Sequence, residues 1–369
     1  MEKNVELPDF TKNNYPETTK SAVLNKTFDI QLKDTKLGKM GSHDLLIKVM
    51  AVGICGSDVH YYDHGRIGDF VVKKPLISGH ESSGIVVAVG DEVTKFKHGD
   101  KVVMEPGIPC GKCKYCLAGK YNLCPQMKFM ATPPVDGDLS QLIIYPDEFT
   151  YKIPNEMSYE VGSLSEPLSV GVHAAQMLSI QPGKSVFVSG AGPVGLLAIM
   201  AAKAFGASKI IASDAEPERL ACAKKMGADT VIDVTEQDVK TTTNDLTNGE
   251  GVNTVIEASG NVHAEQDALL TLSRGGKIAY VGMPAQDEIP LNMPFIQGHE
   301  IQIFGVFRYA NDYPISIEIL TENLEKAEML LTNFYSLAET KSALENTRTN
   351  KQHSLKTIIY PNEQLRKNN

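Results

Sequence analysis

Residues 185–214 read SVFVSGAGPVGLLAIMAAKAFGASKIIASD and join two apolar runs through a glycine-rich turn. The first run predicts a buried strand, and the turn has the pattern G-x-G-x-x-G at Gly190, Gly192 and Gly195. Apolar residues at helical spacing follow, and the second apolar run ends at Asp214. A strand, glycine turn, helix and strand in this order predict the first βαβ unit of a Rossmann domain.

Each glycine of this turn has a distinct expected task. Gly190 would make the tight turn, Gly192 would let a pyrophosphate approach the backbone, and Gly195 would let helix and strand pack closely. The carboxylate of Asp214 would accept hydrogen bonds from ribose hydroxyls and repel the extra phosphate of NADP, so we expect NAD. The alternative interpretation is a structural glycine turn beside a surface aspartate.

The alternation of strands and helices continues beyond this unit. Strands are expected at 229–234, 253–259, 277–282 and 300–306, with helices between them, including one at 218–226. This regular alternation of strands and helices predicts an α/β domain with a doubly wound parallel sheet. The tail after 306 is expected to be helical and to end in a strand at 355–361 that returns to the first domain.

The first 160 residues have a different pattern of apolar segments. Short apolar segments at 45–55, 84–90 and 101–107 are separated by Gly and Pro, which predicts a mainly β, loop-rich domain. The whole chain has 369 residues, 42% hydrophobic and 22% charged, with a net charge of -9. This composition is typical of a globular protein and argues against nucleic acid or a membrane as partner.

Four of the six cysteines, Cys110, Cys113, Cys116 and Cys124, lie in one loop. The first residues, MEKNVELPDF, are polar, so we expect no secretory leader and a reducing cytoplasm. Metal binding is then a better interpretation than disulfides. Four thiolates predict a closed, structural zinc site. An iron–sulfur cluster ranks second, and four free cysteines are the remaining alternative.

A second set of metal-ligating residue types is dispersed along the chain. Cys55 follows the expected strand at 45–55, His80 and Glu81 come about twenty-five residues later, and Glu166 precedes the nucleotide-binding domain. Cysteine, histidine and carboxylate are all good zinc ligands. Taken singly, Cys55 is as compatible with a small buried residue, and His80 with a hydrogen-bonded core histidine.

The chain resembles the zinc-dependent medium-chain dehydrogenases, and within them the sorbitol (polyol) dehydrogenases. The motifs that carry the resemblance run through nearly the whole sequence in order: CGSDVHYY, GRIGDFVVKKPLISGHESSG, the four-cysteine loop, ATPPVDGDL, EPLSVGVHA, GAGPVG and GVFRY. The resemblance implies a GroES-like, mainly β catalytic domain over 1–165 and 306–369, with the zinc loop at 110–124. A Rossmann domain would cover 166–305, with the active site in the cleft between them.

The resemblance also implies roles for individual residues. Cys55, His80 and Glu81 match catalytic zinc ligands, and Asp58 matches the carboxylate that orients the ligand histidine. Glu166 would either ligate the ion directly or hold a water or substrate oxygen beside it. Matches to substrate positions are Tyr61, Phe129, Thr132, Glu166, Arg308 and Tyr309. Besides the glycines and Asp214, matches to NAD positions are Val194, Arg219, Val281, Gly282, Met283, Val306, Phe307 and Arg308.

Ser57 and His60 match proton-relay positions of the wider family, although His60 is equally compatible with a plain surface histidine. The function implied is hydride transfer between a polyol and NAD, giving the 2-ketose. The alternatives are another zinc dehydrogenase of the superfamily, acting on butanediol, threonine or simple alcohols, or a non-catalytic structural member of the fold. The resemblance further implies a homo-oligomer, most simply a tetramer. The chain keeps all four loop cysteines, whereas several animal sorbitol dehydrogenases lack some of them and the structural zinc. This departure weakens the transfer of exact substrate preference and assembly geometry from the family.

Overall fold

The computed structural model describes residues 7–284, 286 and 288–362, which form two compact units. The first unit runs to Glu166 and resumes at Leu320, and the second spans Pro167–Ile319. The second unit therefore includes residues 306–319, which the sequence assigned to the first. Side-chain hydrogen bonds explain the difference, because Ser169 Oγ lies 2.9 Å from Ser316 Oγ and His173 Nδ1 lies 3.0 Å from Asp312 Oδ2.

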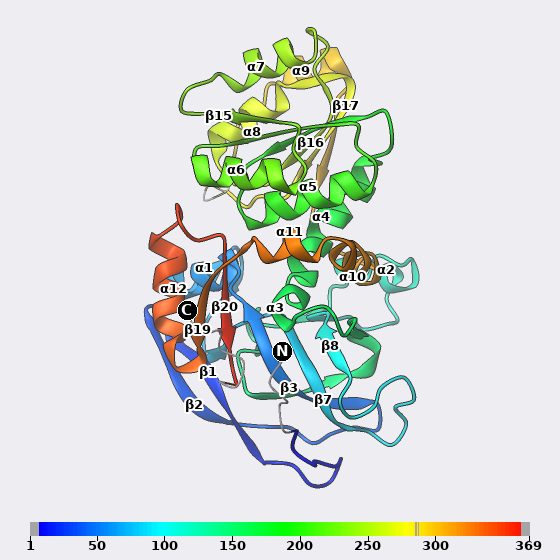
Figure 1. The fold of residues 1–369 in the computed structure, drawn as a ribbon, viewed down its shortest axis with the longest axis vertical. Helices are drawn as coiled ribbons and strands as arrows, with labels where there is room; N and C mark the ends of the chain where they lie inside the picture. The colour runs from blue at the N-terminus through cyan, green and yellow to red at the C-terminus, as the bar shows by residue number, and fades with distance from the viewer. Residues whose placement is uncertain (1–6, 285, 287, 363–369) are drawn as a thin grey trace. The chain divides into compact units, whose positions relative to one another are not determined.

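The first unit is built on a seven-stranded sheet with the order β12-β8-β7-β3-β20-β19, with β11 also paired to β3. Figure 1 labels its strands β3, β7, β8, β19 and β20. Its strands are β3 (Asp44–Gly53), β7 (Glu81–Val89), β8 (Lys101–Met104), β11 (Leu142–Pro146), β12 (Thr150–Lys152), β19 (Leu331–Ser336) and β20 (Lys356–Tyr360). β3 and β7 are buried over most of their length, which fits their long apolar runs. The core of this unit lies against these strands and includes Leu45, Ile47 and Val86.

Smaller elements complete the first unit. A three-stranded sheet has the order β2-β1-β6, and two further pairs are β10-β9 and β4-β5. These strands are β1 (Thr18–Lys26), β2 (Asp29–Lys36), β4 (Arg66–Ile67), β5 (Phe70–Val71), β6 (Leu76–Ile77), β9 (Gly107–Ile108) and β10 (Lys128–Phe129). The helices are α1 (Gly56–His64), α2 (Lys114–Leu117), α3 (Tyr159–Gly162), α11 (Leu324–Glu328) and α12 (Thr340–Thr349), with α4 (Ser165–Leu178) beginning in this unit.

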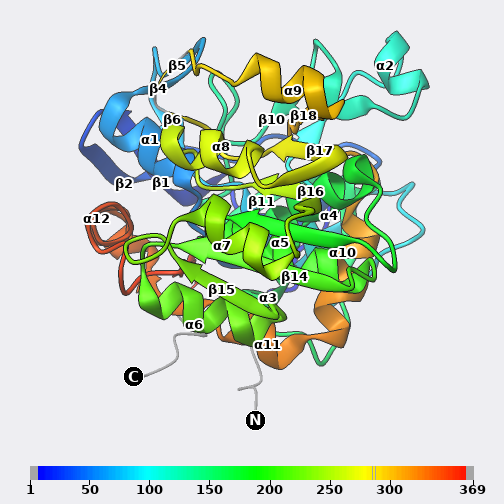
Figure 2. The same ribbon diagram turned by 90° about the horizontal axis from the view of Figure 1, so that it is seen from above.

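The second unit contains the predicted parallel sheet. Its order is β15-β14-β13-β16-β17-β18, and all its pairings are parallel. Figure 2 labels every strand of this sheet except β13. The strands are β13 (Ser185–Ser189), β14 (Lys209–Asp214), β15 (Thr230–Asp233), β16 (Val252–Glu257), β17 (Leu272–Tyr280) and β18 (Gln302–Gly305). Reading strand order outward from β13 gives the 3-2-1-4-5-6 arrangement of the doubly wound fold, which confirms the predicted fold class.

Helices connect these strands or follow the last of them, and the sequences of several of these helices explain where they begin and end. They are α5 (Pro193–Ala204), α6 (Pro217–Met226), α7 (Val239–Leu246), α8 (Val262–Leu269), α9 (Met293–His299) and α10 (Tyr313–Glu322). Proline opens both α5 and α6, and Gly227 ends α6 with a φ of 125°. Asn261 caps α8 by accepting hydrogen bonds from two backbone N–H groups.

Two expectations about local structure need correction. The segment at 101–107 is not one strand, because β8 ends at Met104 and β9 is a separate short strand. The tail is not helical up to 355, because β19 lies between α11 and α12 and pairs in parallel with β20. The tail does return to the first unit as predicted, since β20 also pairs with β3.

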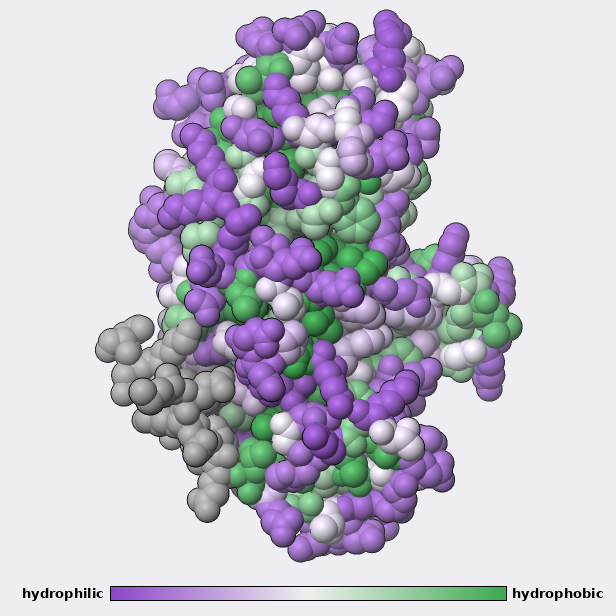
Figure 3. All heavy atoms as spheres, turned by 45° about the vertical axis from the view of Figure 1, so that its right-hand side comes forward, coloured by the Kyte–Doolittle hydropathy of each residue, from purple (hydrophilic) through white to green (hydrophobic). Residues whose placement is uncertain are grey.

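Hydrophilic side chains cover much of the face drawn in Figure 3, with smaller hydrophobic areas between them. Within the described part of the chain, no helix is both long enough and apolar enough to span a bilayer.

Candidate active site and structural metal site

The predicted ligands Cys55, His80 and Glu81 come together at the end of one strand pair. β3 and β7 are antiparallel with Gly53 opposite Glu81, so the residues just after β3 lie beside those at the start of β7. One ligand atom from each of the three side chains lies within 4.8 Å of the others. A thiolate, an imidazole and a carboxylate at this separation are a donor set suited to zinc.

Asp58 supports this group through the backbone. It lies in the first turn of α1, whose N-cap is Cys55, and its carboxylate accepts the Cys55 N–H and the Gly79 N–H at 3.0 Å each. Its Oδ1 lies 3.8 Å from His80 Nδ1, which is too long for a hydrogen bond. Asp58 therefore fixes the two ligand-bearing segments relative to each other, and contacts the imidazole only electrostatically.

Electrostatics of the site favour a cation. Burial lowers the pKa of His80, but the negative charges of Asp58 and Cys55 outweigh it and hold the pKa well above its usual value. Among the described residues, the buried Nδ1 of His80 has no hydrogen-bond partner. The same negative charges would stabilise a bound metal cation, so the residues present fit zinc.

The structure adds two buried ionisable residues that the sequence analysis missed. Lys356 Nζ lies 2.5 Å from Glu81 Oε2 and 3.2 Å from the carbonyl oxygen of Ile54. Asp138 is fully buried, and burial raises its pKa to about 7, although the nearby Ser82 hydroxyl acts in the opposite direction. A lysine in the otherwise apolar LKTIIY segment was the one available signal for Lys356.

Other predicted residues of the first unit surround this group or lie near it. Glu166, 6% exposed, begins α4, and its charge raises the pKa of both His80 and Lys356. The Phe129 ring lies 5.8 Å from the His80 ring. Thr132 donates its backbone N–H to the Phe129 carbonyl oxygen. Ser57, His60 and Tyr61 are on α1, where Tyr61 is buried and His60 is exposed.

The four loop cysteines form a second cluster. All four Sγ atoms lie within 4.8 Å of one another, and two of the separations are 3.4 Å (Cys113 to Cys116) and 4.0 Å (Cys110 to Cys116). Sulfur atoms around a tetrahedral zinc ion lie roughly 3.8 Å apart, so the cluster fits this ion. A backbone hydrogen bond from Lys112 is the main cause that lowers the pKa of Cys110 to about 6, which favours a thiolate ligand.

The glycine turn of the second unit has the geometry expected for a dinucleotide. Gly190 has a φ of 89°, and a Cβ on Gly195 would lie 1.9 Å from the Gly190 carbonyl oxygen. A Cβ on Gly192 would meet nothing nearer than the Arg219 guanidinium at 3.8 Å, which leaves open space above the N-terminus of α5. This space is where a pyrophosphate would approach, so the residues fit the cofactor.

Asp214 ends β14 beside this turn. Its carboxylate accepts the backbone N–H groups of Ala191 at 2.8 Å and Glu216 at 3.0 Å, and Arg219 Nη1 lies 3.9 Å away. Val194 lies in the first turn of α5. Asp214 therefore lies beside the glycine turn, and its role toward a cofactor stays a prediction.

The remaining predicted cofactor positions follow the last strands of the sheet. Val281 and Gly282 donate their backbone N–H groups to the carbonyl oxygen of Glu257, and Met283 is exposed. Val306 follows β18 and donates to the Tyr280 carbonyl oxygen. The guanidinium of Arg308 lies 4.7 Å from the centre of the Phe307 ring, and its backbone is left-handed with a φ of 57°. Tyr309 is buried and its ring lies 5.6 Å from that of Tyr313.

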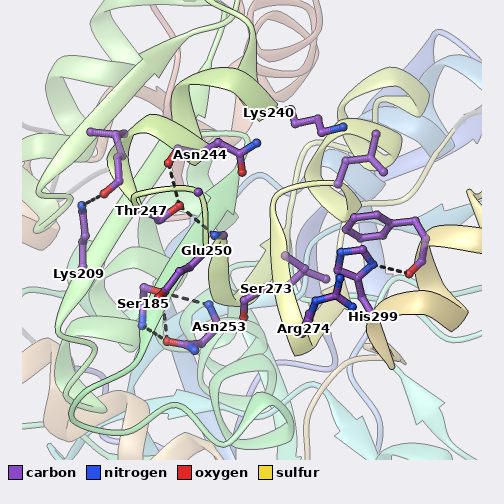
Figure 4. A pocket seen from close by; sticks show the side chains of 16 residues that line it. Ser185, Lys209, Lys240, Asn244, Thr247, Glu250, Asn253, Ser273, Arg274 and His299 are labelled. Atoms are coloured by element: carbon purple, nitrogen blue, oxygen red, sulfur yellow. Dashed lines mark hydrogen bonds between the residues drawn. The ribbon is translucent and has the colours of Figure 1, made fainter.

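A separate cavity of about 940 Å³ opens in the second unit, as Figure 4 shows. It is lined by the starts of β13, β14 and β17, the strand ends opposite the glycine turn. Several of the polar side chains that line it already make hydrogen bonds to other protein groups. Ser185 and Asn253 bond to each other, Lys209 donates to the Leu246 carbonyl oxygen, and Arg274 to that of Gly298.

Comparison with known proteins agrees with this geometry. Residues 41–155 match the alcohol dehydrogenase GroES-like domain family, and residues 193–322 match the zinc-binding dehydrogenase family. The chain is 50% identical to sorbitol dehydrogenase of Bacillus subtilis, over 94% of this chain and 98% of that protein. It is 41% identical to D-xylulose reductase A of Aspergillus niger, over 92% and 96% of the two chains.

A solved structure of an oxidoreductase from Escherichia coli matches with a TM-score of 0.89 and 37% identity, covering 93% of this chain and 99% of that one. Family matches to both units, together with half of all residues identical to one relative over nearly the full length, cannot arise from a shared fold alone. The chain therefore belongs to the zinc-dependent medium-chain dehydrogenases, within their sorbitol dehydrogenase subfamily.

Proposed function

We propose that this protein oxidises a polyol to the corresponding 2-ketose, reversibly, with NAD as hydride acceptor. The observation that carries the proposal is the convergence of Cys55, His80 and Glu81, whose ligand atoms lie within 4.8 Å of one another. The relatives named for sorbitol and xylulose chemistry support a polyol as substrate. A hydride leaves the carbinol carbon for the nicotinamide, and the hydroxyl proton is released.

We infer that Cys55, His80 and Glu81 hold a zinc ion, which would supply Lewis acidity that lowers the pKa of a bound hydroxyl. Around that position, Glu166 is a buried carboxylate able to accept a hydrogen bond from a water or a substrate hydroxyl. Glu166 is absent from the group of mutually close ligand atoms, which supports a role beside the ion and not on it. Asp58 holds Cys55 and the segment before His80 in place throughout.

The NAD assignment rests on Asp214. Its partly exposed carboxylate would accept ribose hydroxyls at the edge of the glycine turn and repel a 2′-phosphate. Gly190, Gly192, Gly195 and the N-terminus of α5 would receive the pyrophosphate. Val194, Arg219, Val281, Gly282, Met283, Val306, Phe307 and Arg308 are the further proposed cofactor contacts.

Recognition of several neighbouring hydroxyls would distinguish a polyol from a simple alcohol. Tyr61 and Tyr309 bring phenolic hydroxyls and Arg308 brings a planar set of donors, whereas Phe129 and Thr132 are the proposed walls. A site that hydrogen-bonds a substrate hydroxyl strongly rejects analogues without it. Ser57 and His60 are the proposed path for the proton. We further propose one catalytic and one structural zinc per chain, a cytoplasmic location and a homotetramer.

The direct test is an initial-rate comparison of sorbitol, xylitol, L-iditol, 2,3-butanediol, threonine and ethanol with NAD and with NADP. The rates are recorded before and after chelation with dipicolinate, followed by zinc addition. We expect NAD-dependent polyol oxidation that chelation abolishes and zinc restores. Faster butanediol, threonine or ethanol oxidation would favour another dehydrogenase of the superfamily, and no NADH from any substrate would favour a non-catalytic member.

The cofactor assignment has a matched pair of variants. Asp214 and Asp233 are register partners at the ends of adjacent parallel strands. The Asp233 carboxylate instead accepts a hydrogen bond from the backbone N–H of Thr235 in the turn that follows its own strand. Asp214→Ala should raise the KM for NAD about tenfold or more, a loss of ~1.4 kcal/mol, and leave the zinc content unchanged. Asp233→Ala should leave the KM for NAD unchanged. An unaltered KM in Asp214→Ala would overturn the assignment.

For Glu166 the informative readouts are kcat and zinc content together. Glu166→Ala should lower kcat about a hundredfold, as for loss of a group that acts in proton transfer, and retain the catalytic zinc. Loss of zinc in proportion to activity would show that Glu166 is itself a ligand.

A further inference from the structure

His60, Asp63 and His64 lie on the C-terminal half of α1, at helical spacings of three and four. One ligand atom from each lies within 4.8 Å of the others. The two imidazole rings are 5.6 Å apart at their centres, and His64 Nδ1 makes a short contact with Asp63 Oδ1. Two imidazoles and a carboxylate thus converge on one helical surface.

The proposed catalytic zinc ligands lie at the opposite end of this helix, although His60 is also a proposed proton-relay residue. Cys55 is the N-cap of α1, and His64 is its last residue, about two helical turns away. The two clusters share no residue. The side chains of His64 and Asp63 are 63% and 17% exposed, so an ion could reach them from solvent without opening the core.

We propose that His60, Asp63 and His64 bind a further divalent transition-metal ion, of the Zn²⁺ and Ni²⁺ type that imidazole prefers. Ligand atoms around a tetrahedral ion lie roughly 3.3 Å apart, and the three ligand atoms here already lie within 4.8 Å of one another, so small rotations of these side chains could bring them to an ion. The position in the last helical turn also favours a cation, because the helix dipole is negative there. A cation near this cluster is Arg348, whose charge interacts with Asp63 and which is also paired with Glu345 at 2.7 Å.

The test is isothermal titration of the zinc-loaded full chain with NiCl₂. Zinc content is measured before and after the titration, so that nickel exchange at the other sites is detected. Wild type should bind one Ni²⁺ per chain without releasing zinc. His64→Ala and His60→Ala should each weaken this binding at least about tenfold.

His43 is the matched control, because it is an exposed histidine with a single carboxylate neighbour, Glu92, at 2.9 Å. His43→Ala should bind Ni²⁺ like wild type. The proposal is overturned if wild type binds no additional Ni²⁺, if His64→Ala and His60→Ala bind like wild type, or if His43→Ala loses affinity as they do. Thermal unfolding of each variant verifies that it is folded, and the exposed positions make this the expected result.

Discussion

Lys356 Nζ lies 2.5 Å from Glu81 Oε2, and the two side chains are 3% and 1% exposed. A Cβ on Gly53 would lie 2.3 Å from the same carboxylate oxygen, so Glu81 has little freedom to turn away. The lysine therefore holds one oxygen of a proposed zinc ligand in a buried position. Removing it would leave a buried carboxylate without its counter-charge.

Lys356→Ala should lower the free energy of unfolding by about 3–5 kcal/mol in the metal-free protein. The loss should be smaller with zinc bound, because the ion would supply positive charge to Glu81. Urea unfolding with and without zinc measures both values. The control is Lys152→Ala, since Lys152 is half exposed and pairs with Asp100 at 2.8 Å, so its loss should cost under about 1 kcal/mol. Equal effects of the two substitutions would contradict the assigned role of Lys356.

Two glycines of the same turn should respond differently to alanine. In Gly195→Ala, the new Cβ would lie 1.9 Å from the Gly190 carbonyl oxygen, so α5 would have to move and the melting temperature should fall. In Gly192→Ala, the nearest atom would be 3.8 Å away, so the melting temperature should stay within about 2 °C while affinity for NADH falls about tenfold.

Thermal unfolding and NADH fluorescence titration separate these outcomes. Normal NADH binding by a fully stable Gly192→Ala variant would show that the space above α5 does not receive the pyrophosphate. A fully stable Gly195→Ala variant would contradict the tight packing of helix on strand.

Much of this organisation could be predicted from the sequence, because local patterns encode it. The apolar runs and the helical spacing around Gly190 predict the nucleotide-binding unit, and the close spacing from Cys110 to Cys124 predicts the loop cluster. Sequence spacing could not reveal Lys356, because the contact with Glu81 depends on pairing of β20 with β3, hundreds of residues apart in the chain. Similarly, β19 was missed because LTNFYS gains its strand conformation from the parallel partner β20.

Glu265 predicts a pH dependence of stability in the second unit. Burial, and then the charge of Glu257, raises its pKa from 4.5 to about 7. The folded protein therefore holds this proton more tightly than the unfolded chain does. Its contribution to stability is complete below pH 4.5 and is lost as the pH rises through about 7.

Glu265→Gln removes that titration, so the variant should gain free energy of unfolding relative to wild type at pH 8 and much less at pH 5. Urea unfolding at the two pH values measures the difference. Asp267→Asn, an exposed acid on the same helix, is the control and should shift stability equally at both. A constant difference between Glu265→Gln and wild type would refute the assigned pKa.

The cysteine loop should owe its order to a metal ion. Cys110 donates its backbone N–H to Cys124 Sγ at 3.4 Å, so the first and last ligands already lie together, and no disulfide joins any described cysteine. Cys110→Ser replaces a soft thiolate with a hydroxyl, and zinc content should fall by about one ion per chain. Cys222→Ser, on α6 and outside both clusters, should retain all zinc. Metal analysis after gel filtration measures the zinc content of both variants. An unchanged zinc content in Cys110→Ser would exclude the four-cysteine site, because three remaining thiolates cannot complete a tetrahedral coordination shell alone.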